Sequence, residues 1–427
     1  MVELASRLFL QLVVILEACR LVGWLGRRFL GQTQVVGEMV AGVLLGPSFL
    51  GWIAPKAQAA LFPRELTVGG ITADHPSMAI LYVLSQLGLV LYMFLVGMEL
   101  DLGLLRARAR GAGAVSIAGI LAPFLLGGAL GWHLASDISL FGAGVTPGSA
   151  ALYLGASMAI TAFPMLARIL FERGLVRTRL GTMALAAGAV DDAVAWGLLA
   201  VVLAVVRGAP WSVAYTFVGT ALFVVVTWTV GRPLLARLQG GRQIGRLDPA
   251  LVTRILAPVF VAAWLTERLG IYAVFGAFVT GLAMPRGSLA ELVRERLEPL
   301  AVSLFLPVFF TYSGLNTQIG LVESWPLWQL TAVVVVIAIL GKGIACALVA
   351  RAAGESWRDA TVLGSLMNAR GLMELIILDI GLAAGLITPT LFTIMVLMAI
   401  VTTVMASPLA GALLRGRQDV GGAAEGA

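Results

Sequence analysis

The sequence predicts an all-α membrane protein that crosses the lipid bilayer about 13 times. Of its 427 residues, 59% are hydrophobic and 12% are charged, and the mean hydropathy is +0.97. These values exclude an ordinary soluble domain. Apolar runs of about 20 residues, the length needed to cross the hydrocarbon region, recur along the whole chain. The arginines lie in short clusters between these runs.

The apolar runs predict the spans in order. Six precede the middle of the chain, at about 3–25, 33–54, 78–100, 111–133, 148–171 and 180–206. Seven follow, at about 211–231, 250–268, 270–285, 297–317, 327–350, 360–385 and 390–413. An odd number of spans gives the two halves of the chain opposite orientations.

The charges between the runs predict the orientation. Most arginine clusters fall on one side, and few basic residues clearly fall on the other: Lys56, Arg64, Arg207 and Arg268. By the positive-inside rule, the N-terminus is outside and the C-terminus is cytoplasmic. This topology also accounts for the net charge of +6, which in a soluble protein would suggest nucleic acid as a partner. No nucleic-acid partner is expected here.

The first span is expected to be retained in the mature protein. It carries Glu17 and Arg20 and has no small-residue cleavage site at its end. The two cysteines, Cys19 and Cys346, both fall inside predicted spans, so neither a disulfide framework nor a metal site is predicted. No cofactor is expected, and no nucleophile-base pair or phosphate loop indicates an enzyme.

Two adjacent carboxylates, Asp191 and Asp192, lie in the middle of the apolar run 180–206. Ionised groups at bilayer depth are costly and normally face a water-filled cavity, which indicates a functional site. Two carboxylates in a low-dielectric setting hold either protons or a cation. The alternative is a structural acid that pairs with a buried base.

A polar interruption with a proline precedes this pair, at 157–164. Proline removes a backbone donor and frees carbonyls that a cation could use, so Ser157, Thr161 and Pro164 are candidates for the site. An ordinary proline kink is the alternative.

A second interruption, in the run 360–385, contains Asn368, Arg370 and Glu374. Arg370 and Glu374 are four residues apart and can neutralise each other on one helix face, which favours a supporting role over ion binding. The interruption at 159–164 has its counterpart at 367–372, and the Gly-Pro segment at 42–47 has its counterpart at 281–285. Inverted repeats with paired broken helices are typical of secondary transporters with a site at the midplane.

Lys342 lies between long apolar stretches in a chain that has only two lysines. Lysine can lose its proton when desolvated, whereas arginine effectively cannot. The natural partner of a midplane lysine is a midplane carboxylate, Asp191 or Asp192. Snorkelling of the side chain to the membrane interface is the alternative. The acids Glu17, Glu38 and Asp379 also lie within spans and suit a cavity or a packing role equally.

Several motifs, taken in order, resemble monovalent cation:proton antiporter family 2. They lie at 37–47, 92–101, 157–168, 272–285 and 368–375, and the last is similar to the plant and bacterial cation/proton exchanger branch. Within this resemblance, Asp192 matches the carboxylate present throughout the family, Asp191 matches a position that varies, and Lys342 matches the core lysine of electrogenic bacterial sodium/proton antiporters. The exchanger branch often has Asn-Asp where this chain has Asp191-Asp192, so the ion stays open between Na+ and K+.

The resemblance implies a homodimer in which each protomer has a dimerisation scaffold and a core domain with two crossed, discontinuous helices. The core helices would cover about 78–206 and 327–413, the scaffold helices about 3–54 and 250–317, and a linker helix about 211–231. The core would move past the scaffold in an elevator-like motion. Residues 415–427 are expected to form a short cytoplasmic tail, with no regulatory domain.

The expected function is exchange of Na+ or K+ for H+ by alternating access, with competition of cation and proton at Asp191 and Asp192. An electrogenic exchange follows if two protons leave for each monovalent cation. An ion-gated sensor or channel on the same fold, or an organic-anion carrier, is the alternative. The expected location is the inner membrane of a bacterium.

Overall fold

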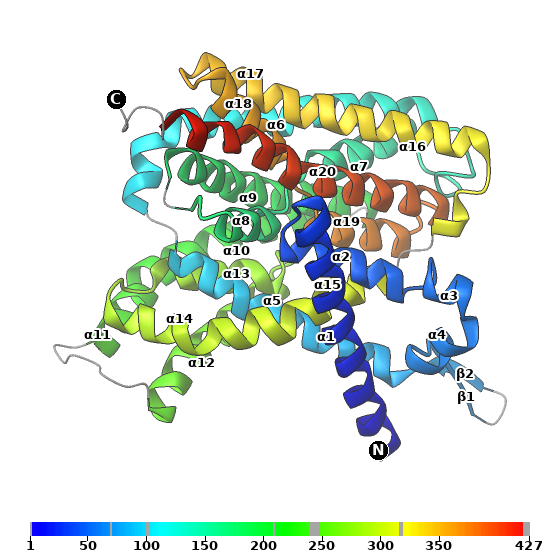
Figure 1. Ribbon diagram of the computed structural model, residues 1–427, viewed down its shortest axis with the longest axis horizontal. Helices are drawn as coiled ribbons and strands as arrows, with labels where there is room; N and C mark the ends of the chain where they lie inside the picture. Colours follow the sequence, from blue (N-terminus) through cyan, green and yellow to red (C-terminus); the bar gives the residue numbers. More distant parts are fainter. Residues whose placement is uncertain are drawn as a thin grey trace.

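The computed structural model describes residues 2–68, 71–99, 102–176, 178–207, 210–239, 248–315 and 319–421. Within these ranges the protein is almost wholly helical (Figure 1). The described strands, β1 (Glu65–Val68) and β2 (Ile71–Asp74), form one antiparallel hairpin in which Glu65 pairs with Asp74. The sequence did not lead us to expect this hairpin.

One group of elements, here called the scaffold group, comes from the beginning of each half of the chain. Its N-terminal helices are α1 (Val2–Leu30), α2 (Gln34–Leu45), α3 (Leu50–Ile53), α4 (Pro55–Leu61) and α5 (Pro76–Glu99). Its later helices are α12 (Pro249–Arg268), α13 (Ala273–Ala283), α14 (Ser288–Leu300) and α15 (Leu306–Leu315). A π-helical stretch, η2 (Ala301–Phe305), joins α14 to α15, and a short 3₁₀ turn, η3 (Ile319–Leu321), follows.

The second group, here called the core group, contains the residues of the predicted site. Its first part is α6 (Leu102–Leu134), α7 (Pro147–Ala159), α8 (Phe163–Glu172) and α9 (Arg179–Arg207). Its second part is α16 (Trp325–Ala338), η4 (Ile339–Ile344), α17 (Ala345–Ala352), α18 (Trp357–Met367), α19 (Leu372–Ala383) and α20 (Pro389–Gly421). Between the two parts, α10 (Pro210–Val226), η1 (Thr227–Gly231) and α11 (Arg232–Gln239) connect the core group back to the scaffold group.

The expected apolar runs all contain helix. Nine helices in the described part of the chain are long and apolar enough to cross a membrane, and the shorter apolar helix α13 adds a candidate. The runs 148–171 and 360–385 are each divided between two short helices, as the interruptions predicted. The count of 13 spans stays a prediction. Helix α20 continues to Gly421, into the segment expected to be a tail.

The two groups occupy different halves of the molecule. Figure 1 shows α16, α17 and α20 along the upper edge and α12, α14 and the hairpin in the lower half. Within the core group, α6 packs against α7, α9 and α17. Within the scaffold group, α2 packs against α1 and α15.

Helix α5 is placed here in the scaffold group because of its packing, while the expected start of the core near residue 78 stays a prediction. Its main partners are α13 and α15, and its contact with α8 is small. Glycines cause this pairing: a Cβ atom at Gly97 would lie 2.3 Å from the Phe278 carbonyl oxygen, and one at Gly281 would lie 2.2 Å from the Phe94 carbonyl oxygen. Only residues without a side chain let the two backbones come this close.

Candidate functional site

Two broken helices meet in the middle of the core group. The chain leaves helical geometry at residues 160–162, between α7 and α8, and again at 368–371, between α18 and α19. The two breaks contact each other directly, because the Ala162 N–H donates to the Ala369 carbonyl oxygen at 3.2 Å. Pro164 lies in the first turn of α8, where its missing N–H costs no helical hydrogen bond.

Asp191 projects from α9 into this crossing and is fully buried. Its Oδ1 accepts a hydrogen bond from the Ser116 hydroxyl at 2.5 Å, and its Oδ2 accepts one from the Thr161 hydroxyl at 2.5 Å. The Lys342 Nζ lies 3.3 Å from the same Oδ2. Three different segments therefore hold this carboxylate.

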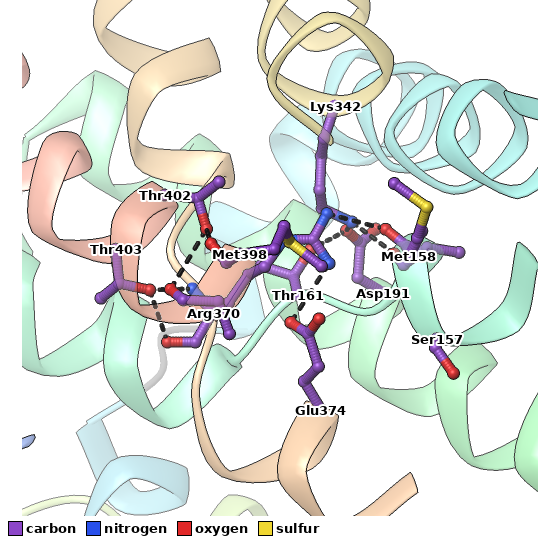
Figure 2. Close-up of polar contacts among 12 residues, drawn as sticks. Ser157, Met158, Thr161, Asp191, Lys342, Arg370, Glu374, Met398, Thr402 and Thr403 are labelled. Atoms are coloured by element: carbon purple, nitrogen blue, oxygen red, sulfur yellow. Dashed lines mark hydrogen bonds and ion pairs between the residues drawn. The ribbon is translucent and has the colours of Figure 1, made fainter. Parts of the chain in front are cut away.

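Figure 2 shows that the Lys342 side chain points into the crossing from the side opposite Asp191. It lies in η4, a π-helical stretch inside an otherwise α-helical span, and π-helical turns occur frequently at functional sites. Besides Asp191, its ammonium donates to the Gly119 carbonyl oxygen at 2.9 Å and to the Ala159 carbonyl oxygen. The side chain is buried and does not snorkel to an interface.

Two cations satisfy the C-terminal end of α7. The last carbonyls of a helix lack partners within it, and this end carries the negative part of the helix dipole. The Arg370 guanidinium donates to the Met158 carbonyl oxygen at 2.9 Å, and the Lys342 ammonium donates to that of Ala159. The broken helix thus ends against positive charge.

Asp192 is buried one residue further along α9. Its carboxylate has fewer hydrogen-bond partners than that of Asp191. The Asp192 carboxylate lies near the backbone N–H of Phe163, the first residue of α8. The N-terminus of a helix favours negative charge. The Asp192 Oδ1, however, has no hydrogen-bond partner among the described residues, and a buried oxygen in this position normally has one.

Arg370 and Glu374 form a second buried ion pair, with 3.2 Å between Nη1 and Oε2. The backbone of Arg370 is fixed by Thr403 of α20, whose hydroxyl accepts from the Arg370 N–H at 2.8 Å and donates to the Arg370 carbonyl at 2.9 Å (Figure 2). These contacts hold the second break in place. The supporting role expected from the spacing of Arg370 and Glu374 stays a prediction.

The structure places Ser157 and Asn368 beside the crossing without joining them to the carboxylates. The Ser157 hydroxyl donates to the Tyr153 carbonyl one turn earlier at 2.9 Å, so a role as an ion ligand stays a prediction. Asn368 packs against Gly343, where a Cβ atom would lie 2.2 Å from the asparagine Nδ2. It therefore supports the turn that carries Lys342.

Sequence reasoning missed several members of the site. Ser116 is one, and its signal was a polar residue inside the apolar run 111–133. Thr403 gave a similar signal in the last run. The carbonyl oxygens of Gly119 and Ala159 gave none, because a backbone group has the same chemistry at every position. In the part of the chain that the structure describes, no group of three or more His, Cys, Asp or Glu could hold a metal ion.

Two adjacent clefts lie between the core and scaffold groups next to the first break. One is small and is lined by Ala162, Met165, Phe309, Tyr92 and Arg168. The other shares Tyr92 and Arg168 and is also lined by Glu99 and Glu298. The Arg168 charge is balanced by Glu172, with 2.9 Å between Nε and Oε1.

Comparison with known proteins gives a consistent result over nearly the whole chain. Residues 17–416 match the family model described as sodium/hydrogen exchanger, transmembrane. The chain is 40% identical over 407 residues to the "Na(+)/H(+) antiporter NhaS4" of Synechocystis, covering 93% of this chain and 95% of that protein. It is 37% identical to the "Cation/H(+) antiporter 17" of Arabidopsis thaliana, covering 94% of this chain and 48% of that protein. The chain thus spans about half the length of this plant relative.

Among solved structures, the chain is similar to the sodium proton antiporter MjNhaP1 from Methanocaldococcus jannaschii. The TM-score is 0.58 and the alignment covers 97% of both chains. At 15% sequence identity this similarity concerns the fold alone.

Proposed function

The chain belongs to the sodium/hydrogen exchanger family, and from this premise we propose how its buried charges carry out cation/proton exchange. The protein is an integral membrane antiporter for monovalent cations and protons, with Na+ or K+ exchanged for H+, and not an enzyme. The remaining questions are where the ions bind and how their binding is linked.

The observation that carries the proposal is the unpartnered, buried Oδ1 of Asp192 next to the Asp191–Lys342 ion pair. A monovalent cation binds at Asp192, and a proton competes with it for the same carboxylate. Each of them supplies the positive partner that this buried oxygen lacks. The exchange is obligatory because the carboxylate cannot hold both ions at once.

Asp191, Thr161 and the backbone of the first break complete the proposed binding site. The carbonyl oxygens at residues 160–162 are outside regular helix, and such carbonyls can coordinate a cation. Thr161 already donates to Asp191, so its oxygen lone pairs remain available to a bound ion. Lys342 sets the net charge of the site through Asp191.

Transport occurs by alternating access, in which the core group carries the ion past the scaffold group. The scaffold group would form the contact between two protomers of a homodimer. The two broken helices belong to inverted repeats, which supports this mechanism. At each break, the partly negative end of one half-helix and the partly positive start of the next lie near the same point.

The test is ion exchange in everted membrane vesicles, with a pH-sensitive dye to report dissipation of an imposed pH gradient. Lithium, sodium, potassium and rubidium are added in turn, which also identifies the preferred ion. Wild type should dissipate the gradient and Asp192→Asn should not. Asp137→Asn is the matched control, because Asp137 is an exposed loop residue and its loss should leave exchange unchanged.

Retained exchange in Asp192→Asn at wild-type amounts of folded protein would overturn the site assignment. A wild-type protein that passes cations without moving protons would instead be a channel.

A further inference from the structure

The boundary between the core and scaffold groups includes apolar contacts beside the first break. Phe163 of α8 packs edge-to-face on Phe278 of α13, with 5.3 Å between ring centroids. Met165 and Phe309 line the neighbouring cleft. Apolar contact is non-directional and depends on buried area rather than on alignment, so such a surface can slide with little change in energy.

A group of polar side-chain contacts crosses this boundary at one place. Among the residues whose side chains the structure describes, three side-chain hydrogen bonds that join the two groups lie at the segment 31–34, between α1 and the first residue of α2. The Gln34 N–H donates to the Glu172 Oε2 at 2.6 Å, and the Gln32 amide donates to the Val404 carbonyl oxygen at 2.6 Å. The Arg173 guanidinium donates to the Gly31 carbonyl oxygen at 2.7 Å.

Two of these bonds use a backbone group at an end of a helix on the scaffold side. Gln34 is the first residue of α2, so Glu172 places a negative charge at the start of that helix. Gly31 follows the last residue of α1 in a left-handed conformation, φ +60°, and presents its carbonyl oxygen to the core group. Only a residue such as glycine takes up this conformation readily.

Arg173 ties this contact to a second core helix. Besides Gly31, its Nη2 donates to the Ser407 hydroxyl at 2.9 Å and to the Ser407 carbonyl at 3.1 Å, both on α20. The arginine therefore joins α8 and α20 and presents them together to the turn. A shift of one helical turn, about 5.4 Å, would separate all three pairs, because hydrogen bonds weaken steeply beyond about 3.5 Å.

We propose that the turn at 31–34 is a latch that fixes the register of the core group against the scaffold group in this conformation, with Glu172, Arg173 and Val404 as its core side. The inference rests on the proposed function, since it needs the core group to move during exchange. The apolar contacts of the boundary permit the movement, and the latch decides where it stops. Each transport cycle opens and closes these three hydrogen bonds.

A reversible cross-link tests the latch directly. Cysteines replace the partners in the pair Gln32→Cys and Val404→Cys, and a short bifunctional methanethiosulfonate reagent joins them. Exchange in vesicles should stop on cross-linking and return on reduction with dithiothreitol. Each single variant, treated in the same way, should stay active, and the native cysteines Cys19 and Cys346 are buried.

A second test weakens the latch without adding a constraint. The double variant Gln32→Ala, Arg173→Gln should depopulate this conformation. Because apparent affinity scales with the population of the binding-competent state, the KM for the cation should rise at least threefold on one face of the membrane and fall on the other. Right-side-out and everted vesicles measure the two faces.

Arg179→Gln is the matched control. It removes a 2.8 Å ion pair to Glu355 that lies inside the core group, so it should leave both KM values unchanged. Exchange that continues in the cross-linked protein, or KM values that change equally on both faces, would overturn the latch. Absence of exchange in the wild type would instead overturn the proposed function.

Discussion

The Lys342 ammonium and the Asp191 carboxylate lie 3.3 Å apart and are both fully buried. Each also has neutral partners, the carbonyls of Gly119 and Ala159 for the lysine and the hydroxyls of Ser116 and Thr161 for the aspartate. A buried ion pair is favourable only when the remaining donors and acceptors are satisfied in this way. The pair therefore joins α6, α7, α9 and η4 at a single point.

Removing one member of this pair should destabilise the protein more than removing both. Lys342→Met leaves a buried carboxylate without its counter-charge, which typically costs about 3–5 kcal/mol. The double variant Lys342→Met, Asp191→Asn removes both charges and should recover more than half of the loss. Thermal unfolding in detergent measures both variants, and equal losses in single and double variants would contradict the pairing.

The dependence of exchange on membrane potential should change in Asp191→Asn. If both carboxylates, or one carboxylate and Lys342, each release a proton per cation, net charge moves, and the potential contributes about 2.3 kcal/mol per charge per 100 mV. Removing one titrating group should make the exchange less sensitive to an imposed potential in proteoliposomes. An unchanged sensitivity to membrane potential would contradict a mechanism in which both carboxylates release protons.

Thr403→Val should disturb the second break, whereas Thr402→Val should not. The Thr403 hydroxyl bonds both backbone groups of Arg370, so its loss leaves two buried polar groups without a partner, at about 1–3 kcal/mol each. Thr402 is equally buried, but its hydroxyl donates to the Met398 carbonyl within its own helix. Unfolding temperature and exchange rate should both fall in the first variant, and similar values for the two would count against the role of Thr403.

Stability should depend on pH through His75, which precedes α5. Its Nδ1 accepts from the Ser77 N–H at 3.1 Å, so it must be unprotonated there. Burial, with the nearby Arg7 charge, lowers the pKa of His75 from its ordinary 6.5. Near pH 6.5 the unfolded chain then binds more protons than the folded protein. The stabilisation of the folded state by unprotonated His75 is therefore present above about pH 6.5 and is lost as the pH falls below it. His75→Asn should flatten the unfolding temperature between pH 5 and 7.5, and an unchanged slope would exclude the histidine.

Gly97→Ala should destabilise the scaffold group, whereas Gly113→Ala should not. A Cβ atom at position 97 would clash with the backbone of α13, and one at position 113 meets nothing within 4 Å. Overpacking typically costs about 1–3 kcal/mol, while alanine favours an open helical site by up to about 1 kcal/mol. Unfolding temperatures of the two variants should therefore move in opposite directions.

The sequence by itself determined the membrane class, the placement of the apolar runs and the two breaks. Hydropathy over about 20 residues and the presence of charged residues at bilayer depth can both be read from a short stretch of sequence. Each is informative because placing polar or charged groups in the hydrocarbon region costs a large free energy. For the same reason Asp191, Asp192, Lys342, Arg370 and Glu374 could be singled out without coordinates. Each is an ionisable residue within a run that is otherwise mostly apolar.

Only the tertiary structure decided how these residues are paired and which helices form each group. It placed Lys342 beside Asp191 and left one oxygen of Asp192 without a hydrogen-bond partner among the described residues, and it packed α5 against α13 and α15. Pairings of this kind depend on backbone carbonyls and on close approach at glycines. These contacts form where helices that are distant in sequence cross. The spacing of residues along the chain does not predict where that crossing lies.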